Sequence, residues 1–119
     1  IYSLYVRALV RNVNTAFLNS LFSLRKPDLI LFFDIDVNEA LKRKGIKSEY
    51  DMSYWEAGGD LELSDNRINN WLMYQEKISA EYRKLFFKMQ NVCLIDANQS
   101  ENDIYVQIVA KIDEMLWGE

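Results

Sequence analysis

The sequence has 119 residues, half of them hydrophobic and 27% charged, and its formal net charge is −4. This balance is typical of one folded domain or part of one; it excludes a disordered tail, and without an apolar run of about 18 residues the sequence predicts no membrane span. The acidic charge argues against a nucleic-acid surface, and with no histidine and one cysteine, Cys93, the chain cannot supply a zinc site, an internal disulfide or a histidine-activated nucleophile.

The first predicted element is a helix in two pieces over residues 3–24, because apolar residues recur there at helical spacing. Lys26-Pro27 ends it, since proline cannot continue a helix. Arg7 and Arg11 lie four residues apart and therefore share one helix face. That face either meets an anion or is solvated.

Two short apolar runs predict strands. Residues 29–33 are five consecutive large apolar residues, and residues 92–96 form a second run of the same kind. Apolar runs without polar alternation are typical of strands that are buried on both faces of a sheet.

Three more helices are predicted around these strands. A short helix follows residues 29–33 and ends at Gly45, and residues 46–63 are predicted to be irregular. The longest helix is predicted over about 64–90, where apolar residues follow three-and-four spacing over many turns. The last helix begins at Ser100, which caps it, and its apolar residues are expected on an inner face.

Strands separated by helices predict an α/β fold, with a parallel sheet wrapped by helices and two strands and four to five helices in this chain. Two strands cannot bury both faces of a parallel sheet. We therefore expect residues 1–119 to be one portion of a longer domain whose other strands precede this chain. The single cysteine agrees with a cytoplasmic location.

Several polar residues follow the two predicted strands. In an open parallel sheet, ligands bind beyond the carboxyl ends of the strands. Asp34 lies at the first of these ends, where it either orients a magnesium ion or bonds to the loop backbone. Asp36 is predicted to cap the short helix, and we assign no residue as a metal ligand.

A cluster of cations follows the first strand and the short helix: Lys42, Arg43, Lys44 and Lys47. Ammonium and guanidinium groups neutralise the non-bridging oxygens of phosphates, so the cluster suits a nucleotide. The alternative is a solvated helix end, because cations favour helix C-termini. The sequence contains no phosphate-binding loop of the GxxxxGK[ST] pattern.

Taken together, these segments resemble the C-terminal part of the thymidylate kinase family, a branch of the P-loop nucleoside monophosphate kinases. The resemblance runs through IYSLYVRALVRN, KPDLILFFDIDVNEALKRK, SEYDMSYWEAGGDL, NNWLMYQEKISAEYRKLF and VCLIDANQS. It covers essentially the whole sequence. It implies a P-loop kinase-type fold and transfer of the γ-phosphoryl group of ATP, with Mg²⁺, to a deoxynucleoside monophosphate such as dTMP.

The resemblance also implies roles for individual residues. On the first helix, the residues at the monophosphate or base of the acceptor would be Ser3 and Arg7. Residues of about 42–63 would form a lid, whose catalytic cations would be Arg43, Lys44 and Lys47. The adenine of ATP would bind to the loop Ala97, Asn98 and Gln99. The implied partners are nucleotide substrates, and a homodimer is left open.

Two other functions stay open at this point. A deoxynucleoside kinase could use the same sheet, and a non-catalytic binding module could use its apolar helices, above all residues 64–90, as an interaction surface. A GxxxxGK[ST] loop after a strand in the preceding part of the protein would favour a kinase.

Overall fold

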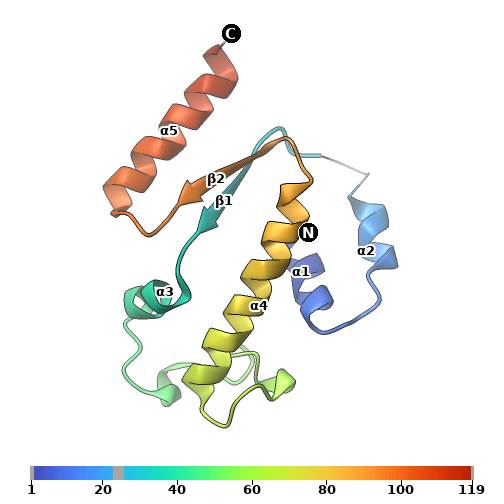
Figure 1. The fold of residues 1–119 in the computed structure, drawn as a ribbon, viewed down its shortest axis with the longest axis vertical. Coiled ribbons are helices and arrows are strands. Elements are labelled where there is room, and N and C mark those ends of the chain that lie inside the picture. Colours follow the sequence, from blue (N-terminus) through green and yellow to red (C-terminus); the bar gives the residue numbers. More distant parts are fainter. Residues whose placement is uncertain (1, 23–25, 119) are drawn as a thin grey trace.

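The computed structural model describes residues 2–22 and 26–118, and Figure 1 shows how their elements are arranged. Within these residues, the helices are α1 (Tyr2–Val10), α2 (Ala16–Leu21), α3 (Val37–Lys44), α4 (Arg67–Phe87) and α5 (Glu101–Trp117). The strands are β1 (Ile30–Asp34) and β2 (Val92–Asp96), and two 3₁₀ turns are η1 (Glu49–Asp51) and η2 (Gly59–Leu61). The predicted α/β order of elements is confirmed.

The sheet consists of β1 and β2, which pair in parallel with Ile30 opposite Val92 and Asp34 opposite Asp96. A parallel pair requires a long crossover, and here α3 and α4 lie within it. The prediction of a parallel sheet is confirmed, and β1 begins one residue later than predicted. The backbone N–H of Ile30 donates to the carbonyl of Asn91 at 2.8 Å, which aligns the starts of the two strands.

The prediction that both strands are buried on both faces is wrong for the described residues. Phe33 is 48% exposed and Leu94 is 60% exposed. Helix α4 covers part of one face, where the rings of Tyr82 and Phe86 pack against Phe32. The described helices therefore cover only part of the sheet, which accounts for the exposed apolar side chains.

Helices α1 and α4 pack side by side, as Figure 1 shows. Val6 of α1 is fully buried and packs with Tyr74 of α4. Tyr2, at the start of α1, makes an edge contact with Phe86, near the end of α4, at 5.6 Å between ring centroids. The two helices are therefore antiparallel. The predicted two-piece helix is confirmed as α1 and α2, while its predicted end at Leu24 lies outside the described residues.

The segment 46–63 is irregular as predicted, but it is tightly held on α4 by one buried side chain. Asn70 is 2% exposed. Its Nδ2 donates to the carbonyls of Ala57 at 2.7 Å and Gly58 at 2.9 Å, and its Oδ1 accepts from the backbone N–H of Leu63 at 2.7 Å and Ser64 at 2.9 Å. All four hydrogen-bonding positions of the amide are used, so this segment has a fixed place on the helix.

The helix ends follow local capping. Asp36 caps α3 as predicted, because its carboxylate accepts from the backbone N–H of Asn38 and Glu39, and α3 ends at Gly45 with φ of +69°. Helix α4 begins later than predicted because Asn66 caps it. None of the described helices combines the length and the apolar character that a bilayer crossing needs.

Helix α5 begins at Ser100 as predicted, where the Ser100 hydroxyl accepts from the N–H of Asp103 at 3.2 Å. Its predicted inner face is not covered by the described residues. No residue of α5 is buried there, and Ile112, Met115 and Leu116 are 37%, 46% and 58% exposed. The helix contacts β2 and projects away from the other helices, as Figure 1 shows.

Candidate functional site

A cavity of about 1020 Å³ lies between α1, α4 and the residues that follow α3. Its volume is in the range of sites for small molecules. The polar and aromatic residues that line it include Ser3, Arg7, Lys44, Trp55, Tyr74 and Gln75. The structure therefore brings together three of the residues proposed from the sequence, Ser3, Arg7 and Lys44.

Arg7 is the cation of this cavity that is available to a ligand. Its side chain is exposed, and within the described residues its guanidinium has no hydrogen-bond or ion-pair partner. A guanidinium offers five N–H donors in a fork that matches carboxylate and phosphate oxygens. Ser3 lies one helical turn earlier in α1 and adds a hydroxyl group to the same wall.

Lys44 also lines the cavity, but the charge of its ammonium is balanced by a neighbouring carboxylate. Its ammonium forms an ion pair with Glu56, and it lies 5.9 Å from the ring centroid of Trp71. The hydrogen bond from Lys44 lowers the pKa of the Glu56 carboxyl, so this pair stays charged at neutral pH. A bound anion would compete with Glu56 for Lys44.

Arg7 and Arg11 differ although both line the cavity. Helix α1 ends at Val10, so Arg11 lies in the turn that follows. Its guanidinium is held by Asp60 and Tyr74, whereas that of Arg7 is not engaged by the described residues. Helical spacing alone could not distinguish the two arginines, because the partners of Arg11 come from distant segments.

Arg43 lies away from this cavity and joins α3 to the loop after β2. Its Nη1 donates to the carbonyl of Ala97 at 2.6 Å, and its Nη2 donates to the carbonyls of Asn98 at 2.9 Å and Gln99 at 2.8 Å. Its Nε forms an ion pair with Glu39 at 3.1 Å. The structure thus unites Arg43 with all three residues proposed for the adenine site, a contact that the sequence did not predict.

The loop after β2 is held by further internal hydrogen bonds. The Asp96 carboxylate accepts from the backbone N–H and the Nδ2 of Asn98, which lowers the pKa of Asp96. The Oδ1 of Asn98 accepts from the backbone N–H of Asp36 at 2.9 Å. Gln99 donates weakly to Asp96 and accepts from Gln107 at 2.9 Å. These hydrogen bonds therefore hold the loop in one conformation and use the polar side chains of Asn98 and Gln99.

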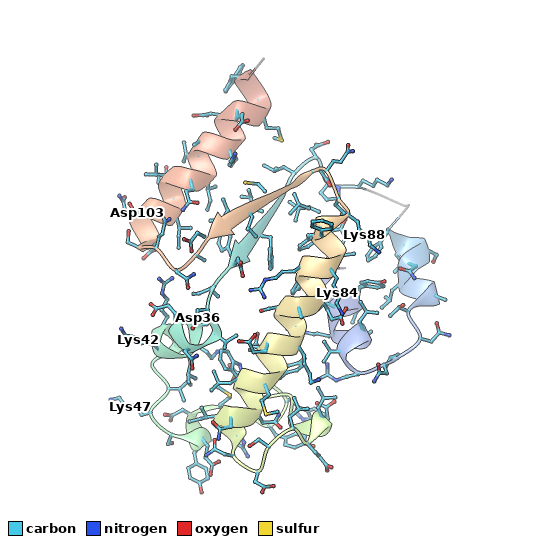
Figure 2. The ribbon with its side chains drawn as sticks, viewed as in Figure 1. Asp36, Lys42, Lys47, Lys84, Lys88 and Asp103 are labelled. Carbon is cyan, nitrogen blue, oxygen red and sulfur yellow. The ribbon has the colours of Figure 1, made fainter. Side chains whose placement is uncertain are left out.

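Of the two remaining predicted positions, Lys47 lies apart from the cavity and from the loop after β2, whereas Asp34 contacts that loop. Lys47 is exposed, and Figure 2 shows it with Lys42 on the outer side of the chain around α3. Asp34 forms an ion pair with Arg83 of α4 at 2.7 Å, and its backbone carbonyl accepts from the N–H of Ala97 at 2.9 Å. Within residues 2–22 and 26–118, no three carboxylate or thiol side chains gather closely enough to hold a metal ion.

The sequence reasoning missed several residues at these places. It proposed no binding role for Tyr74 or Gln75, yet both line the cavity. It did not single out Arg83 as a partner of Asp34. The positions of Tyr74 and Gln75 on the long helix would have indicated that they line a cavity only if the packing of α1 on α4 had been known.

Comparisons with known proteins agree with the resemblance in the motifs. No family model matches the chain. The chain is 31% identical over 100 residues to a thymidylate kinase of Finegoldia magna. These aligned residues make up 84% of this chain and 40% of that protein. It is 28% identical over 92 residues to thymidylate kinases of two Shewanella strains, MR-4 and MR-7, covering 77% of this chain and 37% of each of them.

The chain thus spans about two fifths of the length of the curated relatives that it matches. This share agrees with the expectation that it corresponds to one portion of such a protein. The predicted resemblance is confirmed: over 77–84% of its own length, this chain is similar to the thymidylate kinase family.

Proposed function

We propose that the protein containing this chain is a nucleoside monophosphate kinase that transfers the γ-phosphoryl group of ATP to a deoxynucleoside monophosphate, with dTMP as the first candidate. The observation that carries the proposal is the similarity to three curated thymidylate kinases over 77–84% of this chain. The cavity between α1 and α4 supports it, because its lining combines aromatic rings with the guanidinium of Arg7, which no described residue engages. We further propose that residues 1–119 are the C-terminal portion of the kinase domain.

In this proposal the cavity binds the acceptor nucleotide. Arg7 donates to the oxygens of its phosphate, which the guanidinium fork suits. The hydroxyl of Ser3 offers a further hydrogen bond to the phosphate or the base. The exposed ring of Trp55 supplies an apolar face for the nucleoside.

We propose that the adenine of ATP binds at the loop Ala97 to Gln99. Arg43 and Asp96 already hold this loop, so it would receive the base without first becoming ordered. When bound with Mg²⁺, the ATP phosphates supply the transferred group, and the metal neutralises part of their charge. The described residues contain no carboxylate cluster, so we assign no Mg²⁺ ligand among them.

We propose that residues 42–63 act as the lid over the phosphates. Arg43, Lys44 and Lys47 would supply positive charge where negative charge develops during transfer. For Lys44 this requires release from Glu56. Because Asn70 fixes residues 57 and 58 on α4 and Arg43 is bonded to the loop after β2, the part of the lid that moves would lie within residues 44–56.

The proposal is tested by measuring ADP release from ATP by the intact protein with dTMP, dUMP or thymidine as the acceptor. We expect turnover with a monophosphate and none with thymidine. An Arg7→Ala variant should lose binding of the acceptor. A matched Lys111→Ala variant on α5 should behave as the unaltered protein, because among the described residues Lys111 pairs only with its helix neighbour Glu114.

The outcomes separate the functions that stay open. Phosphorylation of thymidine but not of dTMP would indicate a deoxynucleoside kinase. Binding of nucleotides without any ADP release would indicate a non-catalytic binding module. Either result would contradict the proposed monophosphate kinase.

A further inference from the structure

Arg11 uses every nitrogen of its guanidinium in the described contacts. Its Nε and Nη2 form a bidentate pair with Asp60, at 2.7 Å to Oδ2 and 3.1 Å to Oδ1. Its Nη1 donates to the hydroxyl of Tyr74 at 3.0 Å and to the backbone carbonyl of Arg7 at 3.2 Å. Two parallel N–H···O bonds fix orientation as well as charge, which a lysine cannot do.

These contacts join three elements around one point. Arg11 follows α1, Asp60 lies in η2, and Tyr74 is 4% exposed within α4. The guanidinium carbon of Arg11 also lies 5.1 Å from the centroid of the Tyr74 ring. A cation held by three hydrogen-bonding partners and an aromatic ring has one preferred position, so Arg11 sets the spacing between α1, η2 and α4.

The contact with Arg7 links this arrangement to the cavity. Carbonyl groups in the last turn of a helix lack partners within the helix, and Arg11 satisfies the carbonyl of Arg7. Arg7 itself extends into the cavity wall, and its guanidinium is not engaged by the described residues. The backbone from which Arg7 projects is therefore fixed by Arg11, while the side chain is left available.

We propose that Arg11 is a positioning residue of the acceptor cavity. It fastens the end of α1 to Asp60 and Tyr74 and so holds Arg7 where it binds the phosphate of a nucleoside monophosphate. This inference rests on the proposed function and adds to it a residue that acts through Arg7 rather than on the nucleotide.

A simpler explanation would be that Arg11 only adds positive charge near the cavity. The two explanations predict opposite signs for one variant. Asp60→Asn keeps the charge of Arg11 and removes a neighbouring negative charge, so a purely electrostatic role predicts tighter binding of a phosphate. A positioning role predicts weaker binding, because the charged bidentate partner of Arg11 is lost.

The experiment measures equilibrium binding of dTMP and of thymidine to the intact protein and to variants. We expect Arg11→Met to raise the dissociation constant of dTMP on the order of tenfold and Asp60→Asn to raise it about threefold, with thymidine within about twofold of the unaltered protein in both. Arg11→Lys should fall between Arg11→Met and the unaltered protein, since it keeps the charge but not the fork. Lys111→Met removes one cation from α5 and is the matched control.

Each contrary result overturns a different statement. Equal or tighter dTMP binding by Asp60→Asn would overturn the positioning role. Weakening of dTMP and thymidine by the same factor in Arg11→Met would overturn the link to the phosphate and assign Arg11 to the fold alone. Thermal unfolding shows whether Arg11→Met folds. If it does not, binding of dTMP to Arg11→Lys and Asp60→Asn still distinguishes the positioning role from the electrostatic one. An unaltered protein that binds thymidine but no nucleoside monophosphate would overturn the proposed function itself.

Discussion

Two glycines share one backbone conformation but have different surroundings. Gly45 and Gly58 have φ of +69° and +68°, a region that side chains disfavour. A Cβ at Gly45 would meet nothing within 4 Å, whereas a Cβ at Gly58 would lie 2.5 Å from Cγ of the buried Tyr74 ring. The cost of the backbone conformation and the cost of the steric clash can therefore be separated in this molecule.

We expect Gly45→Ala to lower the free energy of unfolding by about 1 kcal/mol, the cost of the left-handed conformation alone. Gly58→Ala should lower it by about 3 kcal/mol or more, because the Tyr74 ring must also move. Urea denaturation of both variants measures the difference. Equal losses in the free energy of unfolding would mean that the Tyr74 ring can move aside without destabilising the fold.

Asn70 is expected to be one of the most sensitive positions. Its side chain serves four backbone groups of residues 57–64, so Asn70→Ala leaves them buried without partners. We expect a loss of about 3 kcal/mol in the free energy of unfolding. Asn69→Ala, at the exposed neighbouring position, is the control and should cost less than about 0.5 kcal/mol. A small effect at Asn70 would show that water replaces the amide.

The pair of Arg11 and Asp60 has a consequence for the dependence of stability on pH. The hydrogen bond from Arg11 lowers the pKa of the Asp60 carboxyl below its ordinary value of 3.8. A lowered pKa in the folded state stabilises the fold above the unfolded value, and this contribution disappears as the pH falls through the folded value. The free energy of unfolding should therefore decrease below about pH 4, and less steeply in Asp60→Asn. Denaturation at several pH values measures how steeply the free energy of unfolding falls as the pH is lowered in the unaltered protein and in Asp60→Asn. The two slopes would be equal if the pair contributed nothing.

At the scale of elements, Arg43 couples α3 to the loop after β2. Arg43→Ala in the intact protein should lower turnover on the order of a hundredfold while the protein stays folded, because it removes a cation and three contacts to that loop. Arg43→Lys restores the charge but not the contacts, so we expect it to recover little.

Steady-state kinetics with circular dichroism as the folding control measure these effects. Full activity of Arg43→Lys would show that the charge alone matters. Unchanged kinetics in Arg43→Ala would remove Arg43 from the proposed lid and leave it a role in the loop only.

Local chemistry explains which elements could be predicted. The β2 run, the Asp36 cap, the end of α3 at Gly45 and the Ser100 cap depend on neighbours within a few residues, and all were predicted correctly. The start of α4 was predicted too early because Ser64, Asp65 and Asn66 are all good capping residues, and the structure shows that Asn66 is the cap, since its side chain accepts from the N–H of Asn69. The expected inner face of α5 was wrong, since burial depends on which segments lie opposite and periodicity does not contain that information.

At the scale of the molecule, the predicted site residues other than Lys47 divide into two groups. Ser3, Arg7 and Lys44 line one cavity, whereas Arg43 contacts the loop of residues 97–99. Sequence spacing could place Arg43 and Lys44 side by side on the chain, yet adjacent residues on a helix point about 100° apart. Their separation therefore follows from helical geometry, but which target each one meets depends on how α3 packs against α4 and the sheet.

The parallel pairing of β1 with β2 also implies an order of events in time. Asn70 bonds to Ala57, 13 positions away, whereas the hydrogen bond between Asp36 and Asn98 at the strand ends spans 62 positions. Closing the longer loop costs about 1 kcal/mol more in chain entropy, and such distant contacts slow folding. Pulse-labelled hydrogen exchange during refolding should therefore protect the amides of Leu63 and Ser64 before those of β2. The sheet, whose ends carry the loop of residues 97–99, would become native after the segment that Asn70 holds on α4.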